Sequence, residues 1–90
     1  MSLKISQSTR FKRDIKKMKK QGRSITELKT LVAMLAERKQ LPEKYKDHSL
    51  TGDYANYREC HIRPDWLLIY KVTADELQLA RTGSHSELFR

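Results

Sequence analysis

Three histidines lie in the C-terminal half of the chain, at His48, His61 and His85, each among polar residues typical of a loop or a strand end. Histidine has an ordinary pKa of ~6.5, so it can accept or donate a proton near neutral pH. Cleavage of RNA by its own 2′-hydroxyl needs a base for that hydroxyl and an acid for the departing 5′-oxygen. The three residues are therefore candidates for proton transfer on a phosphodiester.

The expected connections bring two of these histidines to one carboxylate. His61 and Asp65 flank the turn that precedes a strongly apolar strand. The last strand should run antiparallel to that strand, so its end returns to the same turn. His85 follows this end and should lie near Asp65 and His61. His48 lies on a loop that enters the sheet, which fixes its position less closely.

Cations and aromatic side chains stand near the same strand ends. Arg63 and Arg81 are candidates for stabilising charge on the phosphorane oxygens. Trp66 has two interpretations, a core residue or a platform on which a base stacks. Phe89 follows His85 by one helical turn, so it either covers the core or stacks on a base beside the cleavage point.

A zinc site is the second interpretation of the histidines, because His48, His61 and His85 with Asp65 would make a plausible set of ligands. These residues come from separate segments, without the close spacing of common zinc motifs, so we favour chemistry without a metal or any other cofactor. The single cysteine, Cys60, is expected to be a small buried residue on a strand.

The positive charge is concentrated at the N-terminus. The net charge is +8, and residues 1–23 contain many lysines and arginines but only one acid, Asp14. The alternative is a solvated helix face, but we favour a polyanion such as nucleic acid because the charge is so unevenly placed. No segment approaches the ~20 apolar residues that span a bilayer, and no signal peptide is evident, so we expect a cytoplasmic protein without a membrane partner.

The N-terminal half predicts a strand and two helices. Residues 3–6 suit an edge strand, and apolar residues at helical spacing predict a helix from about Ser8 to Gly22. A capping box of Ser24 and Glu27 predicts the start of a second helix, which should end near Lys39. Two helices with a short link form a helical hairpin.

The C-terminal half predicts three strands. A polar loop over residues 42–53 precedes strands near 57–63, 66–72 and 77–82, and a capping box predicts one helical turn from Ser84 to Phe89. The predicted architecture is α+β, in the order β-α-α-β-β-β with a C-terminal turn. A small antiparallel sheet is covered by the helical hairpin, and residues 1–90 form one domain.

The motifs K-D-H-S-L, Y-R-E-C-H-I-R-P-D-W-L-L-I-Y-K and R-T-G-S-H-S-E-L-F resemble the YafQ branch of the RelE/ParE toxin superfamily. The resemblance covers nearly the whole chain and implies a RelE-like fold. It also implies the toxin of a type II toxin–antitoxin system, a metal-independent endoribonuclease that cuts mRNA in the ribosomal A site. The implied partners are the ribosome, mRNA and a small cognate antitoxin.

The same resemblance assigns roles by position. His48, His61, Asp65 and His85 match the family's catalytic set, while Trp66 and Phe89 match positions that contact mRNA. His85 would be the general acid, His48 with help from Asp65 the base, and His61 would hold the scissile phosphate. Glu59 stands where a shorter acid, aspartate, is expected. Ribosomal RNA would dock on the basic helix, through Lys12, Arg13, Lys16, Lys17, Lys19 and Lys20.

Two other functions compete with this one. A toxin of the ParE type would act on DNA gyrase without catalysis, and its histidines would be incidental. A plain RNA-binding module would use the basic helix alone, but the sequence lacks the aromatic pair and the glycine loop of common RNA-binding folds. The histidines favour the ribonuclease.

Overall fold

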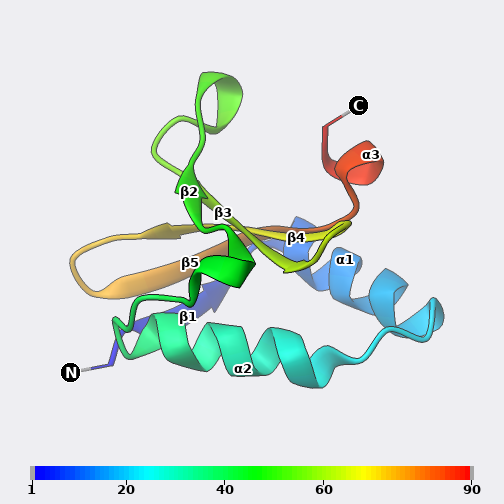
Figure 1. The fold of residues 1–90 in the computed structure, drawn as a ribbon, viewed down its shortest axis with the longest axis horizontal. Coiled ribbons are helices and arrows are strands. Elements are labelled where there is room, and N and C mark those ends of the chain that lie inside the picture. The colour runs from blue at the N-terminus through cyan, green and yellow to red at the C-terminus, as the bar shows by residue number, and fades with distance from the viewer. Residues whose placement is uncertain (1, 90) are drawn as a thin grey trace.

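The computed structural model describes residues 2–89 as a five-stranded sheet with helices on both faces (Figure 1). The strand order is β1-β5-β4-β3-β2. Two long helices, α1 and α2, lie on one side of the sheet, and the short helix α3 lies on the other side (Figure 1). The elements are β1 (Lys4–Gln7), α1 (Thr9–Lys20), α2 (Ile25–Ala36), the 3₁₀ turn η1 (Glu43–Tyr45), β2 (His48–Ser49), the 3₁₀ turn η2 (Gly52–Tyr54), β3 (Arg58–Arg63), β4 (Trp66–Val72), β5 (Glu76–Gly83) and α3 (His85–Leu88).

The prediction of an α+β fold with a helical hairpin is confirmed, with two corrections to the sheet. Strands β3, β4 and β5 pair antiparallel as expected, but β1 pairs parallel to β5, so the sheet is mixed. In sequence, the helical hairpin separates β1 from the other strands. The direction of β1 therefore could not be predicted from short turns, which fix only the directions of consecutive strands. The second correction is β2, a two-residue strand paired with β3 inside the segment that was predicted to be a loop.

Helix α1 begins and ends as its sequence indicates. The Ser8 hydroxyl accepts a hydrogen bond from the Phe11 backbone N–H at 2.9 Å, which satisfies one of the free donors of the first turn. Phe11 and Met18 are buried against the sheet, and lysines occupy the last turn. Gly22 follows with a φ of +76°, a conformation that glycine adopts without a steric penalty.

Helix α2 differs from its prediction at both ends. Ser24 is the N-cap residue, but its side chain makes no capping hydrogen bond, so the predicted capping box is wrong. The Glu27 carboxylate instead forms an ion pair with Arg63 on β3. The helix ends at Ala36, before the expected Lys39, and Arg38 adopts a left-handed conformation with a φ of +62°.

The sheet has an apolar layer on each face because β4 is buried on both sides. Leu68 and Tyr70 face the core under α1 and α2, while Leu67 and Ile69 form a smaller cluster with Leu88 of α3. This explains why β4 is apolar on both faces from Trp66 to Tyr70. None of the helices over residues 2–89 is both long and apolar enough to cross a membrane.

The helix α3 is short but firmly capped. Ser84 and Glu87 form the predicted capping box, in which the Ser84 backbone N–H donates to the Glu87 carboxylate at 2.9 Å. Gly83 precedes it with a φ of +158°, and a Cβ at this position would lie 3.2 Å from Glu87 Oε1. A larger residue where β5 turns into α3 would therefore press on Glu87, the capping residue of the helix that carries His85.

Candidate active site

The structure brings the three histidine rings into one row on the face opposite α1 and α2. The ring centroids of His48 and His61 are 6.1 Å apart, and those of His61 and His85 are 5.6 Å apart. Phe89 extends the row, with its ring 6.3 Å from that of His85. These side chains come from β2, β3 and the region of α3, so the strand pairing assembles the row.

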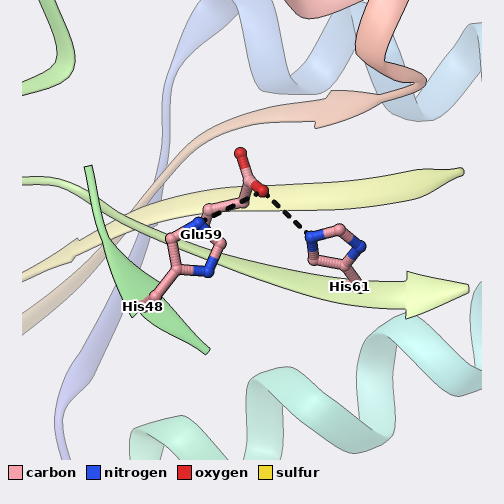
Figure 2. A group of neighbouring side chains, drawn as sticks. All are labelled: His48, Glu59 and His61. Carbon is pink, nitrogen blue, oxygen red and sulfur yellow. Dashed lines mark hydrogen bonds and ion pairs between the residues drawn. The ribbon is translucent and has the colours of Figure 1, made fainter. Parts of the chain in front are cut away.

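A buried carboxylate lies between the first two rings (Figure 2). Glu59 is only 4% exposed, and its Oε1 lies 3.1 Å from His61 Nε2 and 3.6 Å from His48 Nε2. Glu59 pairs with His48 across β2 and β3, and it shares a strand face with His61 two residues later. The short strand β2 therefore sets the position of His48 that sequence reasoning left open.

Asp47 anchors the segment that carries His48. Its carboxylate accepts hydrogen bonds from the Tyr70 hydroxyl at 2.6 Å and from Arg58 Nε at 3.0 Å. The burial of Tyr70 and its hydrogen bond to Asp47 raise the pKa of the Tyr70 hydroxyl, so this hydroxyl remains a donor. His48 Nδ1 lies 2.6 Å from the Lys46 carbonyl oxygen. Because a carbonyl only accepts, Nδ1 carries the hydrogen and Nε2 faces Glu59.

At the other end of the row, Asp65 holds His85. One oxygen of Asp65 lies 3.2 Å from the His85 backbone nitrogen and 3.2 Å from its ring Nδ1. These two donors, the backbone N–H first, lower the pKa of Asp65, so the carboxylate stays ionised. The expected approach of Asp65 to His85 is therefore observed. The expected help of Asp65 to His48 is not, because Glu59 occupies that position.

The structure contradicts the stacking role of Trp66. This side chain is 2% exposed, and its Nε1 donates to Thr82 Oγ1 at 2.9 Å. The Arg23 guanidinium lies 5.6 Å from the centre of the ring. Trp66 has no free face for a base and is a core residue, the first of its two interpretations.

Phe89 is 43% exposed and has aromatic neighbours that the sequence did not assign. Its ring meets that of Tyr54 edge-on, with centroids 5.8 Å apart, and Tyr54 meets Tyr57 at 6.0 Å. These aromatic rings continue the row beyond His85. The sequence spacing of Tyr54 and Tyr57 could not predict this position, because it depends on the fold of the loop between β2 and β3.

Both candidate arginines are bound to acids. Arg81 forms a two-point ion pair with Asp14 of α1, at 2.8 and 3.2 Å, and its side chain is 19% exposed. The hydrogen bond that Arg81 donates to the Asp14 carboxylate raises the pKa of the Arg81 guanidinium. Arg63 is 65% exposed and pairs with Glu27. A contact of either arginine with RNA stays a prediction, and Arg63 has much the larger free surface.

The sequence of the chain is similar to those of known toxins. Residues 3–90 match a family model described as the bacterial toxin of a type II toxin–antitoxin system, YafQ. The chain belongs to the YafQ toxin family. It is 41% identical over 86 residues to the mRNA interferase toxin YafQ of Escherichia coli K12, and the match covers 94% of each chain.

Solved structures of YafQ proteins share the whole fold. The toxin in the DinJ–YafQ toxin–antitoxin complex of E. coli superposes with a TM-score of 0.92 at 38% identity, covering 100% of both chains. A metal-bound toxin from Helicobacter pylori superposes with a TM-score of 0.91 at 44% identity, covering 97% of this chain and 99% of that one.

In this YafQ-family chain the basic face of α1 is exposed, and one of its lysines is paired with an acid. Lys17 forms an ion pair with Glu87 of α3 at 2.5 Å, which ties the basic helix to the helix that carries His85. The hydrogen bond from Lys17, followed by that from Ser84, lowers the pKa of Glu87 from 4.5 to about 2. The other five residues of the predicted docking surface are exposed, namely Lys12, Arg13, Lys16, Lys19 and Lys20.

The side chains that could hold a metal ion differ from those the sequence indicated. Among residues 2–89, potential ligand atoms of His48, Glu59 and His61 lie within 4.8 Å of one another. Asp65 and His85 pair with each other instead, so the predicted set of four ligands is not assembled. Cys60 is buried in the core on the other face of β3, and its burial, more than the nearby carboxylates, raises the pKa of its thiol to about 12. The thiol is therefore inert near neutral pH.

Proposed function

We propose that this chain is an mRNA interferase, an endoribonuclease that cleaves mRNA in the ribosomal A site and thereby inhibits translation in the cytoplasm. The observation that carries the proposal is the row of three imidazoles, with one carboxylate between the first two rings and another beside the third. Glu59 lies beside His48 and His61, and Asp65 lies beside His85. The row offers separate groups for taking and giving a proton, as cleavage by a 2′-hydroxyl requires.

His85 is the general acid in this scheme. Asp65 fixes the hydrogen of the ring on Nδ1, which leaves Nε2 to carry the proton that passes to the 5′-oxygen. The ring is 53% exposed, so a bound strand can reach it. The neighbouring ring of Phe89 is positioned to stack on a base beside the departing oxygen.

His48 is the base and His61 the phosphate ligand. The Lys46 carbonyl fixes the His48 hydrogen on Nδ1, so neutral His48 has a lone pair on Nε2 for the 2′-hydroxyl proton. Once His48 is protonated, the Glu59 carboxylate stabilises its charge. Glu59 also accepts from Nε2 of His61, and a protonated His61 then presents Nδ1–H to the scissile phosphate.

A metal ion would suit His48, Glu59 and His61, since two imidazoles and a carboxylate are ordinary ligands for zinc. A bound ion would supply a Lewis acid at this position. It would also occupy Nε2 of His48, the nitrogen that takes the proton in the scheme above. The proposed reaction therefore uses the side chains of the chain itself.

The proposed partners are a cognate antitoxin, the ribosome and mRNA. The E. coli YafQ structure is a complex with the antitoxin DinJ, which supports an antitoxin for this chain as well. The basic face of α1 is proposed to dock on ribosomal RNA, where each phosphate contact releases counterions and strengthens binding at low salt.

The test is to map new 5′ ends of cellular mRNA after induction of the wild type, His85→Ala and His61→Ala. New ends inside reading frames are expected with the wild type and should fall by at least ~10²-fold with each variant, the typical contribution of a proton-transfer group. Binding of both variants to the antitoxin is the control for folding. Intact mRNA together with DNA damage would instead indicate an action on gyrase.

A further inference from the structure

A hollow of about 330 Å³ adjoins the proposed active site at the open edge of β3. We call it the edge hollow. The proposed reaction uses two of its residues, His61 as the phosphate ligand and Lys46 through the backbone carbonyl that holds His48. The lining residues that matter here are Glu27, Lys44, Tyr45, Lys46, His61 and Arg63.

The short strand β2 leaves room for this hollow. β2 pairs only with Arg58 and Glu59, so within the described residues β3 has no partner strand on that side beyond Glu59. The turn η1 packs beside β3 instead and contributes Lys44 and Tyr45. The first turn of α2 closes the other wall with Glu27. Three segments distant in sequence therefore form the hollow.

The charges in the edge hollow suit an anion. Lys44, Lys46 and Arg63 outnumber the single acid, Glu27, which is bound to Arg63. The side chains of Arg63 and Glu27 are 65% and 38% exposed, so water screens their attraction. Replacing the Glu27 carboxylate by another anion on Arg63 therefore costs little free energy. A phosphate offers the same paired oxygens to a guanidinium as a carboxylate does. Glu27 thus occupies the position that a phosphate would take.

The edge hollow also contains an aromatic ring. Tyr45 is half-buried against the core, and the ammonium group of Lys44 lies 5.0 Å from the centre of its ring. Stacking on an aromatic ring combined with nearby cations is how proteins hold single-stranded RNA without reading its sequence. A base that displaces Lys44 from the ring would leave this lysine free for a phosphate.

We infer that the edge hollow is a nucleotide subsite, which holds a phosphate and a base next to the cleaved phosphodiester of the same RNA strand. This inference rests on the proposed function. His61 belongs both to the row of imidazoles and to the wall of the edge hollow, so a strand bound at the row continues into it. Arg63 is the principal phosphate ligand, and Glu27 competes with the RNA for it.

The experiment measures kcat/KM for mRNA cleavage on programmed ribosomes with Arg63→Gln, Glu27→Gln and, as a matched control, Lys39→Gln. Lys39 is an exposed lysine paired with a nearby glutamate outside the hollow. Arg63→Gln should lower kcat/KM by roughly tenfold or more, the loss of one charge-assisted hydrogen bond. Glu27→Gln should raise it, and Lys39→Gln should leave it unchanged.

A second substrate series identifies the contact. Neutral methylphosphonates replace the phosphate on either side of the cleaved one, one at a time. At one of the two positions, the wild type and Arg63→Gln should have the same kcat/KM. The neutral group removes the contact between Arg63 and that phosphate, so the wild type loses it as well. An equal loss on all substrates, or no loss for Arg63→Gln on natural mRNA, would overturn the inference.

The remaining outcomes separate the possible occupants. If Arg63→Gln cleaves normally but binds the antitoxin more weakly, the edge hollow holds an acidic segment of the antitoxin and the RNA subsite is refuted. If the wild type itself does not cleave mRNA, the proposed function fails, and the subsite fails with it.

Discussion

Glu59 is the residue on which the proposed active site most depends. A buried carboxylate is costly unless it is paired, and the two partners of Glu59 are the rings of His48 and His61. One acid therefore orients two histidines that lie 13 residues apart in sequence. In the sequence-based scheme the acid that assists His48 was Asp65, which lies beside His85 instead.

Replacement of Glu59 by glutamine tests this role with little change in shape. Glu59→Gln keeps a hydrogen-bond acceptor but removes the charge that stabilises protonated His48 and His61. We expect kcat for mRNA cleavage to fall by about 10²-fold, with little change in KM. Glu76→Gln, on β5 away from the row, is the control. Full activity of Glu59→Gln would mean that the carboxylate does not assist the histidines.

At the residue scale, the sequence predicted which histidines converge but not what orients them. His61 and His85 could be placed near Asp65 because short antiparallel connections fix which strand ends meet. Glu59 was noted only as an acid at a position where aspartate is expected, since alternation along a strand does not reveal burial. Trp66 was left open for the same reason, and its burial decides in favour of the core.

The helix α3 carries His85 and is too short to be stable alone. It depends on its capping box, on Leu88 and on the ion pair of Glu87 with Lys17. These contacts join the active site to the basic helix α1. The ion pair of Lys17 with Glu87 thus matters for the active site, because unfolding of α3 would displace His85.

The pKa of Glu87 makes this contact sensitive to acid. A folded-state pKa of about 2, against 4.5 ordinarily, stabilises the folded chain above pH 4.5, and this contribution is lost as the pH falls toward 2. At full value the shift corresponds to about 3 kcal/mol. Since Lys17 is 58% exposed, screening by water lowers the expected contribution to on the order of 1 kcal/mol.

Urea unfolding of Glu87→Gln and the wild type at pH 7 and at pH 2.5 measures this contribution. We expect the variant to be less stable at pH 7 and the difference to shrink at pH 2.5. Glu37→Gln is the matched control, because Glu37 pairs with Lys39 on the exposed end of α2. A difference independent of pH would show that the Glu87 charge does not stabilise α3.

At the element scale, most of the architecture followed from periodicity and caps. The two long helices, the three antiparallel strands and the capping box at Ser84 were predicted. The capping box at Ser24 was wrong because Glu27 has a stronger partner in Arg63, which lies 36 residues away. The strand β2 has only two residues, too few to show the alternation of apolar and polar side chains that predicts a strand. It forms only because it pairs with β3.

Across the whole molecule, the two functions expected of a small ribonuclease lie on different elements. Proton transfer is assigned to the face with β2, β3 and α3, whereas the excess positive charge lies on α1. The net charge of +8 therefore acts mainly through one helix. Lys17 is bound to Glu87, so the free part of this surface is smaller than the sequence indicated.

Replacement of Lys16, Lys19 and Lys20 by glutamine should weaken ribosome association without altering the site. These side chains are exposed, so the fold should be unaffected. The slope of log K against log salt should become shallower by about 2–3 if all three contact phosphates. Sedimentation with ribosomes at several salt concentrations measures this slope. An unchanged slope would remove α1 from the docking surface.

The chemical ends of the cleaved mRNA test the central claim most directly. Attack by a 2′-hydroxyl, assisted by His48 and His85 without a metal, leaves a 2′,3′-cyclic phosphate on one fragment and a 5′-hydroxyl on the other. We predict these ends on mRNA cut by the purified chain on ribosomes, as read by mass spectrometry of the fragments. A 3′-hydroxyl with a 5′-phosphate would show attack by water and contradict the account.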